Sequence, residues 1–480
     1  MSNLSLRLYH GLPAPARSLA ATLRGLYLQW WRYGPDSERL VLAARERAGW
    51  TLAEWAAWRD ERLGYVLHRA ATRVPYYRQR WEARRRRGDR ASPEYLENWP
   101  VLEKDPLRLN PRAFVADDCR PWRMSHEQTS GTSGKPLHLW RSRLTVETLY
   151  ALSITRTREW HGVSRNDRWA MLGGQLVVAA ARRRPPFWVW NAALRQLYMS
   201  SYHLAPDLIP HYLDALVRHR IAYLFGYTSS LFALAQEALR LGRTDLRMRV
   251  AITSAEPVSE RERETIAAAF HCPVRETYGM GELVAAASEC EAGTLHEWPE
   301  IGWIEVRDEA DEPVAPGASG ELICTGLLNA DMPLIRYRVG DSARLRPAAH
   351  ACVCGRGLPA FAGIDGRTND ILLTRDGRRV AWLNPVLYGV PVRQAQIVQE
   401  TLDRVRVRYV PAPEFLPATG RLIAERLRER LGDVAVVLEA ADEIPRSANG
   451  KLRSVVCAIP SEEREALLAT LGTGRTGGVP

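Results

Sequence analysis

The segment Gln128–Pro136 gathers residue types that bind anions. It contains two glycines, one lysine and four hydroxyl side chains. Glycines let backbone N–H groups approach an anion closely, while the hydroxyls and the lysine add donors and positive charge. Two residues separate the glycines and a proline follows the lysine, so the segment differs from the G-x-x-x-x-G-K-[ST] loop. We predict a polyphosphate-binding loop, with a flexible polar turn as the alternative.

A second group of residues has the chemistry of a metal site. Cys290 and His296 are separated by five residues, and Cys352 and Cys354 form a Cys-x-Cys pair further along the chain. Three thiolates and one imidazole favour tetrahedral Zn²⁺. Cys-x-Cys is tighter than the usual finger spacing, so free buried cysteines with a surface histidine are the alternative. We predict a closed, structural zinc site.

The elements that position these residues belong to a large chain. With 480 residues, 46% of them hydrophobic, it can build two or three domains with substantial cores. The formal charge of +11 could attract anionic cofactors or membrane head groups. The run Arg84–Arg87 is the best argument for nucleic-acid binding, but no nucleic-acid-binding motif accompanies it. We expect a solvated helix end there and no nucleic-acid partner.

Other features bear on location. Seven cysteines, an odd number, fit a reducing compartment better than a disulfide scaffold. Polar residues interrupt the most apolar stretch, Ile221–Leu239, and the N-terminus lacks the apolar core of a signal peptide. We therefore expect a cytoplasmic protein. The amphipathic segment around Leu23–Trp31 is expected to pack on the core, with weak membrane-surface contact as the alternative.

Hydrophobic periodicity predicts the order of the elements. Apolar side chains at helical spacing predict a helical lead-in over about residues 19–79, ending near Pro75. Apolar runs that end in turns then alternate with helical patterns, which predicts a largely parallel sheet with ligand sites at the strand ends. Pro- and Gly-bearing turns between strands predict a small β subdomain at about 300–362. The expected strands include Arg168–Gly173, Ala222–Gly226 and Val250–Thr253, and the expected helices Leu231–Leu239 and Glu260–Phe270.

The chain is therefore predicted to have an α/β fold in two domains. Residues 1–365 form the large N-terminal domain, and residues 366–480 form a small, mobile α+β domain joined to it by a hinge. In the small domain we expect strands at Val405–Val410 and Val434–Leu438. Between them, Pro417–Leu431 is expected to form a helix, with the proline at its first position, where a missing N–H costs nothing.

The order of five short motifs carries a family resemblance. After the glycine-rich loop come Ser254-Ala-Glu-Pro257, Tyr278-Gly-Met-Gly-Glu282, Tyr337-Arg-Val-Gly-Asp341, Gly366-Arg-Thr-Asn-Asp370 and Asn449-Gly-Lys451. This series resembles the adenylate-forming superfamily of acyl-CoA synthetases. Within it the chain is similar to the phenylacetate–CoA ligase family, in particular to its capsule-associated branch. The resemblance runs from about residue 61 to residue 460.

The resemblance implies roles for named residues. The β- and γ-phosphates of ATP are expected to be held by Ser130, Gly131, Thr132, Ser133, Gly134 and Lys135. The adenine is expected to lie against Ser254, Ala255, Glu256, Tyr278 and Gly279, with Tyr278 stacked on it. Asp341 would accept hydrogen bonds from the ribose hydroxyls, and Glu282 would hold Mg²⁺. Arg367 would neutralise phosphate, Asp370 would act as the hinge, and Lys451 would stabilise the pentavalent phosphorus.

Two details refine the resemblance. The family usually has threonine at the position of Gly281, and we hypothesise that Thr132 and Ser133 compensate for the lost hydroxyl. A subset of the family carries a structural zinc, and Cys290, His296, Cys352 and Cys354 match that subset. Such a zinc would clamp the β subdomain to the nucleotide domain.

The implied reaction is ATP-dependent activation of a carboxylic acid as an acyl-adenylate. Coenzyme A is the first expectation for the acceptor, and a carrier-protein thiol or an amine are the alternatives. Trp169, Phe225 and Tyr227 are expected to line a pocket for an aryl or hydrophobic acid. A different hypothesis is a non-catalytic nucleotide-binding partner in surface-polysaccharide assembly, recruited to the membrane by the amphipathic N-terminal part and Arg84–Arg87. A homodimer is compatible with either.

Overall fold

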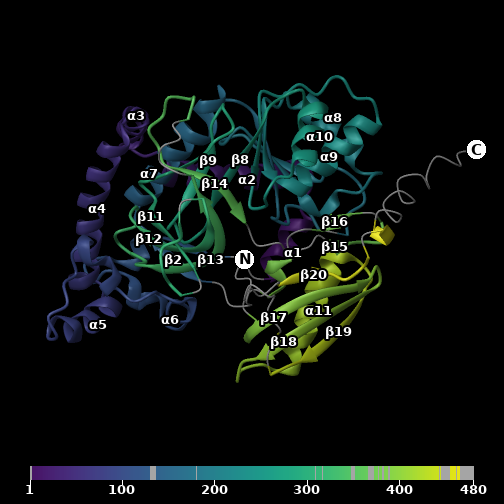
Figure 1. Cartoon of the computed structure of the whole chain (residues 1–480). Helices are drawn as coiled ribbons and strands as arrows, with labels where there is room; N and C mark the ends of the chain where they lie inside the picture. The colour runs from purple at the N-terminus through teal and green to yellow at the C-terminus, as the bar shows by residue number, and fades with distance from the viewer. Residues whose placement is uncertain are drawn as a thin grey trace, which may run out of the picture.

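The computed structural model describes most of the chain. The described residues are 3–129, 137–179, 181–308, 310–315, 317–346, 352–365, 372–376, 378–380, 383–387, 390–442, 444, 454–460 and 462–464. They form a large α/β body and, below it in Figure 1, a smaller sheet with one helix.

Five helices lead into the large body. They are α1 (Asn3–Gly11), α2 (Ala14–Arg32), α3 (Ser37–Arg47), α4 (Leu52–Arg73) and α5 (Pro75–Arg85). A capping box between Thr51 and Glu54 starts α4. The prediction that the helical region ends near Pro75 was wrong, because Pro75 is the first residue of α5 and a proline is tolerated there. The helix runs on to Arg85, so the expected helix end in the arginine run is confirmed.

Twelve strands of the described residues form one sheet. Its order is β11-β12-β13-β14-β10-β9-β8-β7-β6-β3-β5-β4. The strands are β3 (Trp169–Gly173), β4 (Trp188–Asn191), β5 (Gln196–Ser200), β6 (Tyr223–Tyr227), β7 (Ala251–Ser254), β8 (Val274–Gly279), β9 (Ala286–Glu289), β10 (Leu295–Glu297), β11 (Gly302–Arg307), β12 (Ser319–Gly326), β13 (Tyr337–Leu345) and β14 (Ala360–Asp365). Strands β5, β3, β6, β7 and β8 are parallel to one another, and the pairs from β8 to β11 are antiparallel.

The strands expected as a separate β subdomain continue this sheet. Strand β14 pairs with β10, and β9 pairs with β8. Turn residues in the sequence mark where a strand ends but not which strand it pairs with. The parallel half that the β-turn-α pattern predicted is present, with its carboxyl ends on one edge.

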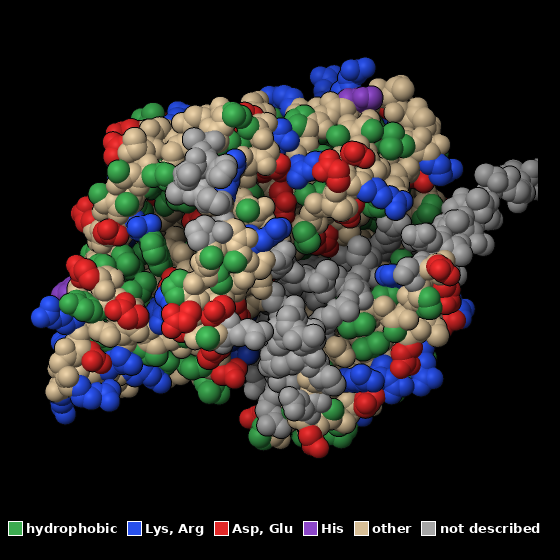
Figure 2. Space-filling model, viewed as in Figure 1, with side chains coloured by type: hydrophobic (Ala, Val, Ile, Leu, Met, Phe, Trp, Pro, Cys, Tyr) green, Lys and Arg blue, Asp and Glu red, His purple; other side chains and the backbone are tan. Residues whose placement is uncertain are grey.

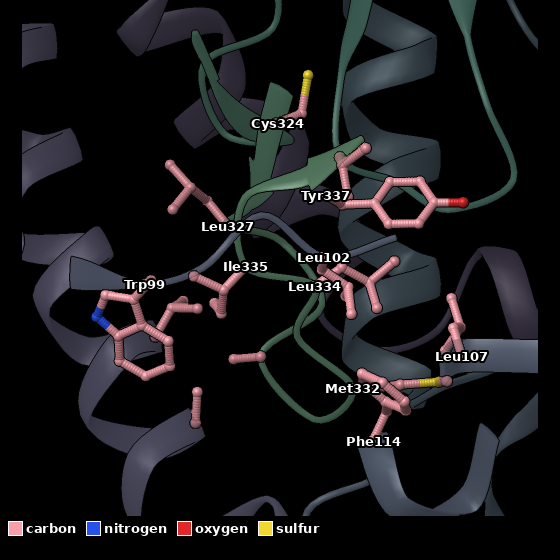
Figure 3. Packing of buried hydrophobic residues seen from close by; sticks show 14 of the residues in the cluster. Trp99, Leu102, Leu107, Phe114, Cys324, Leu327, Met332, Leu334, Ile335 and Tyr337 are labelled. Atoms are coloured by element: carbon pink, nitrogen blue, oxygen red, sulfur yellow. The ribbon is translucent and has the colours of Figure 1, made fainter. Parts of the chain in front are cut away.

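Two large cores lie against the sheet. Helices α8 (Ile209–Arg218), α9 (Thr228–Arg240) and α10 (Glu260–Phe270) cover one face of the parallel half (Figure 1), and their apolar side chains pack on the parallel strands. The second core joins α4, α5 and the following segments to β12 and β13. Figure 3 shows Trp99, Phe114 and Ile335 in this second core, together with Tyr337 of β13. Two further helices, α6 (Lys104–Leu109) and α7 (Arg143–Ser153), complete the large body.

The C-terminal part has its own sheet and core. Strands β17 (Val392–Thr401), β18 (Arg404–Pro411), β19 (Ala435–Ala440) and β20 (Val455–Cys457) pair in the order β19-β18-β17-β20, beside helix α11 (Pro417–Leu431). A small pair, β15 (Leu372–Leu373) and β16 (Arg379–Val380), precedes them. Arg378 Nη1 donates to the Tyr202 carbonyl at 2.9 Å, which ties this part to the large body. The boundary predicted between 365 and 366 falls beside residues 366–371, outside the described part, and stays a prediction.

Charged side chains of both signs lie interspersed on the face shown in Figure 2. Many arginines are ion-paired; Arg69, for example, contacts both Asp118 and Asp331. In the arginine run, Arg84 donates to the Asn98 carbonyl and pairs with Asp89. Within the described part of the chain, no helix is both long enough and apolar enough to cross a bilayer.

Candidate active site

A β-hairpin brackets the predicted phosphate loop. Strands β1 (Ser125–Gln128) and β2 (His138–Arg141) are antiparallel, with Gln128 opposite His138. Beyond them, Thr129 N donates to the Leu137 carbonyl and Leu137 N donates to Thr129 Oγ1, both at 3.0 Å. Residues 130–136 lie outside the described part. The two hydrogen bonds hold the flanking residues, Thr129 and Leu137, next to each other.

The hairpin contacts the turn that follows β8. Arg141 is buried, pairs with Glu127 at 2.8 Å and donates to the Gly281 carbonyl at 2.5 Å. A Cβ added at Gly281 would lie 3.0 Å from Thr129 Cγ2. The Thr129 methyl therefore stands where a side chain at position 281 would need room. Thr129 was predicted only as one hydroxyl of the anion-binding segment and Arg141 was not predicted, although an arginine next to the loop on a short strand was a usable signal.

Tyr278 and Asp341 meet at the carboxyl edge of the sheet. Tyr278 lies near the end of β8, and its hydroxyl donates to Asp341 Oδ2 at 3.0 Å. Asp341 follows Gly340, whose φ is +83°, where the pairing of β12 with β13 shifts register. Such a bulge re-aims a side chain, and glycine accepts this φ without strain. The structure thus brings together two residues that are 63 positions apart in the sequence.

Glu282 lies on the same edge. Its Oε1 accepts a hydrogen bond from the Tyr337 hydroxyl at 3.0 Å. Lys104 Nζ donates to the Val339 carbonyl at 2.8 Å, so this lysine holds β13 in place. A partly exposed carboxylate suits a hard cation such as Mg²⁺.

The Ser254–Glu256 turn is anchored to helix α9. The Glu256 carboxylate accepts hydrogen bonds from Ser229 N at 2.8 Å and from Ser229 Oγ at 3.1 Å, at the start of the helix. Burial raises the pKa of Glu256, and the bond from Ser229 opposes that rise. Its side chain thus caps α9, whereas Ala255 is exposed and has a φ of +65°. The side chain of Glu256, one of the three predicted adenine neighbours in this turn, is thus hydrogen-bonded to the start of α9.

The three predicted pocket aromatics lie on neighbouring strands, and the Trp169 ring meets the Phe225 ring edge-on at 6.3 Å. Tyr227 is at the carboxyl end of β6, in register with Ser254 of β7. Phe225 lies two residues earlier. Trp169 is at the amino end of β3, opposite Tyr223, with its ring stacked on that tyrosine at 5.8 Å and Nε1 donating to the Leu194 carbonyl. The structure therefore places Trp169 at the other end of the strands from Ser254 and Tyr278.

The four predicted metal ligands form one cluster. Ligand atoms of Cys290, His296, Cys352 and Cys354 all lie within 4.8 Å of one another. The Sγ atoms of Cys290 and Cys352 are 3.7 Å apart, and Cys354 Sγ is 3.3 Å from His296 Nε2. Two sulfurs bound tetrahedrally to zinc at about 2.3 Å stand about 3.8 Å apart, so the spacing fits.

The surroundings of the cluster also fit a metal. His296 Nδ1 lies 3.1 Å from the Leu358 carbonyl, which fixes Nδ1 as the protonated nitrogen and leaves Nε2 facing the sulfurs. Burial raises the pKa of Cys352, but hydrogen bonds, the largest from Thr294, outweigh it and lower the value to about 6. The ligands come from β10, from the end of β9 and from the segment before β14, so a metal would hold three segments together.

The remaining predicted site residues lie outside the described part of the chain. They are Ser130, Gly131, Thr132, Ser133, Gly134, Lys135, Arg367, Asp370 and Lys451. Gly279 ends β8 beside Tyr278.

This fold is that of adenylate-forming enzymes. The family model for AMP-binding enzymes matches residues 56–331, and the model for the CapK C-terminal domain matches residues 372–458. The chain belongs to the AMP-binding enzyme family, within its CapK-like and phenylacetate–CoA ligase-like group, so the recognition made from the motif series is confirmed.

Individual relatives agree with this placement. Protein CapK of Staphylococcus aureus is 25% identical over 377 residues, covering 75% of this chain and 80% of the relative. The phenylacetate-coenzyme A ligase of Thermus thermophilus is 31% identical over 257 residues, covering 46% and 57%. A solved 2-hydroxyisobutyryl-CoA ligase in its thioesterification state has a TM-score of 0.55 at 21% identity, covering 86% of this chain and 91% of that one. The predicted fold class is thus confirmed.

Proposed function

We propose that this protein is an ATP-dependent, AMP-forming ligase that joins a carboxylic acid to a thiol. The observation that carries the proposal is the meeting of Tyr278, Asp341 and Glu282 at one sheet edge. The hairpin around residues 130–136 contacts the same turn. A nucleotide needs this combination of an aromatic face, a carboxylate for the ribose and a glycine-rich loop for its phosphates.

In the first step the substrate carboxylate is the nucleophile. Its oxygen attacks the α-phosphorus of ATP, pyrophosphate leaves, and an acyl-adenylate forms. Tyr278 and the Ser254–Ala255 turn flank the adenine, and Asp341 accepts hydrogen bonds from the ribose hydroxyls. The loop with Lys135 binds the departing phosphates, while Arg367 and Lys451 oppose the charge that develops on phosphorus. Mg²⁺ bound at Glu282 supplies further neutralisation of the phosphates.

In the second step a thiol takes the acyl group and AMP leaves. We propose coenzyme A as that thiol, because two of the relatives above are named as ligases of phenylacetate and of 2-hydroxyisobutyrate with coenzyme A. The hinge near Asp370 lets the C-terminal domain change its position between the steps. A carrier-protein thiol or an amine is the other acceptor to be tested, because the segment 375–385 lacks the glycine-rich run common after the hinge in family ligases.

The acid is proposed to be aryl or hydrophobic. Phe225 and Tyr227, on the strand next to Ser254, supply an aromatic wall at the carboxyl end of β6. Burial raises the pKa of Tyr227, so its phenol stays neutral beside a substrate. Trp169 meets Phe225 edge-on but lies at the amino end of β3, so it would border this wall on the side away from Ser254.

One experiment tests the whole proposal. Pyrophosphate release from MgATP is measured with a panel of aryl, aliphatic and hydroxy acids, with Lys451→Ala as the catalytic control. The acids that respond are then incubated with coenzyme A, and the thioester is detected by mass spectrometry. Release that depends on the acid and on Lys451 supports the ligase. If no acid stimulates release, the ligase function is rejected.

A further inference from the structure

Helix α2 presents its polar side to the protein. It packs along β4, the edge strand of the large sheet. Ser18 Oγ accepts a hydrogen bond from Trp190 N at 3.2 Å, Thr22 Oγ1 accepts one from Ala192 N at 3.1 Å, and Gln29 donates to the Ala193 carbonyl. A covered strand edge needs such partners for its N–H and C=O groups, which explains why this face of the helix is polar.

The opposite side of α2 is an exposed apolar stripe. It consists of Leu19, Leu23, Leu26, Tyr27 and Trp30, each between 50% and 61% exposed. Their spacing of three or four residues places them on one side of a helix. Leu8 in α1 and Leu12 between α1 and α2 are also exposed. The expectation that this amphipathic segment packs its apolar side on the core was therefore wrong.

The surroundings of the stripe are basic. The first 35 residues contain no aspartate or glutamate, and of their four arginines Arg24 is exposed and Arg32 half-buried. Arg17 is buried and Arg7 pairs with Glu425. Arg24 lies over the Tyr27 ring at 5.0 Å, and Arg143 lies over the Trp30 ring at 4.4 Å. The acidic Glu147 nearby is buried and bonded to Arg143. The face in Figure 2, by contrast, mixes both signs of charge.

We propose that the stripe on α2 binds the surface of an anionic phospholipid bilayer, with the helix lying parallel to the membrane plane. Leucines would enter the acyl region, Trp30 and Tyr27 would lie at the head-group level, and arginines would meet lipid phosphates. A second copy of the chain fits less well, because a symmetric contact of two stripes would bring two copies of Arg24 and Arg32 together with no acidic residue in this segment to balance them. This inference does not depend on the proposed ligase reaction.

The test uses full-length protein and sedimentation with vesicles. Vesicles of phosphatidylcholine with phosphatidylglycerol are compared with vesicles of phosphatidylcholine alone. We expect the double variant Leu23→Ser/Trp30→Ser to lower the affinity for anionic vesicles by about tenfold or more, since two large apolar contacts are lost. Arg24→Glu should weaken binding to anionic vesicles selectively. The matched control is Leu109→Ser/Trp122→Ser, which changes residues that are 83% and 77% exposed outside the stripe and should bind as wild type.

Three results would overturn the proposal. The first is wild-type protein that stays in the supernatant with anionic vesicles. The second is a stripe variant with a wild-type melting curve that binds as wild type. The third is a dimer of the wild-type protein in sedimentation velocity without lipid, when the stripe variant is a monomer under the same conditions. If the variant fails to fold, wild-type protein is mixed with vesicles that contain a dansyl lipid. Energy transfer from tryptophan to the dansyl group then reports binding, and its absence contradicts the proposal. The variant Arg86→Glu/Arg87→Glu, just after α5 and far from α2 in Figure 1, should bind normally.

Discussion

The Tyr278 hydroxyl donates to Asp341 Oδ2 at 3.0 Å, joining the end of β8 to the bulge in β13. One residue offers a ring face and the other a carboxylate, and the hydrogen bond fixes the angle between them. A nucleotide bound there would meet a preformed corner, with its base against the ring and its ribose against the carboxylate. If the proposed nucleotide site is right, the Tyr278 hydroxyl should affect ATP affinity although it is remote from the reacting atoms.

We expect Tyr278→Phe to raise the KM for ATP several-fold with little change in kcat. The ring that faces the base remains, but Asp341 loses a hydrogen bond of about 1 kcal/mol that orients it. Asp341→Ala should raise the KM further. ATP-dependent pyrophosphate release at varied ATP concentration measures both constants. A Tyr278→Phe enzyme with unchanged KM and a lowered kcat would mean that the hydroxyl acts on the chemistry instead.

A second prediction concerns the packing of Gly281 against Thr129. Gly281→Ala places a Cβ 3.0 Å from Thr129 Cγ2, and overpacking of this kind costs about 1–3 kcal/mol. Adenylation should fall accordingly. Thr129→Ser removes the crowding methyl but keeps the Oγ1 that accepts from Leu137 N, so the double variant should recover much of the activity.

The double-mutant cycle for this pair is read from rates of pyrophosphate release. Strictly additive losses would show that the two positions do not interact. If Gly281→Thr alone increased the rate of adenylation, glycine at this position would be less favourable for activity than the threonine usual in the family. Compensation by Thr132 and Ser133, expected from the sequence, stays a prediction because both lie outside the described residues.

Features of the fold that are specified by neighbouring residues could be predicted from the sequence, whereas features that depend on distant residues could not. The limits of α10 and α11 agree with prediction because Ser259 with Glu262 and Pro417 mark their starts through neighbouring residues. The series of motifs was sufficient to predict the fold class and the family. Local signals did not predict that β14 pairs with β10, which makes the expected β subdomain part of the large sheet.

The parts of the site that were missed depend on contacts between distant residues. Arg141 and Thr129 lie next to Gly281, which is 140 and 152 positions further along the chain, and no sequence pattern at either end specifies that contact. Trp169 was chosen because aromatic residues suit a pocket, but its strand register puts it at the amino end of β3, where its ring contacts Phe225 and not Tyr227 or Ser254. The direction in which α2 faces was also missed, because periodicity finds an apolar side without telling whether protein or solvent lies against it.

The buried carboxyl of Glu276 makes stability depend on pH. Burial, then repulsion from Glu289, raises its pKa from 4.5 to about 7. The folded state therefore holds more protons than the unfolded state between these two values, so this group's contribution to stability falls as pH rises through that window. Glu276→Gln should melt a few degrees higher than wild type at pH 8 and by a smaller margin at pH 5.

Scanning calorimetry of both proteins at pH 5, 6, 7 and 8 measures this difference. Glu264→Gln, which changes an exposed glutamate on α10, serves as the control. It should show no gain that grows with pH. A constant offset between Glu276→Gln and wild type at every pH would assign the effect to packing and not to proton binding.

The last prediction concerns zinc at Cys290, His296, Cys352 and Cys354. Protein purified without chelators should contain about one zinc per chain, because the cluster supplies the four ligands of a closed tetrahedral site. Cys352→Ser should lose most of the metal and melt at a lower temperature, since three segments around β9, β10 and β14 lose their common tie. Cys272→Ser, at a buried cysteine outside the cluster, should keep its zinc. Plasma emission spectrometry measures the metal content. The prediction is contradicted if the purified wild-type protein contains no zinc and added zinc does not change its melting temperature.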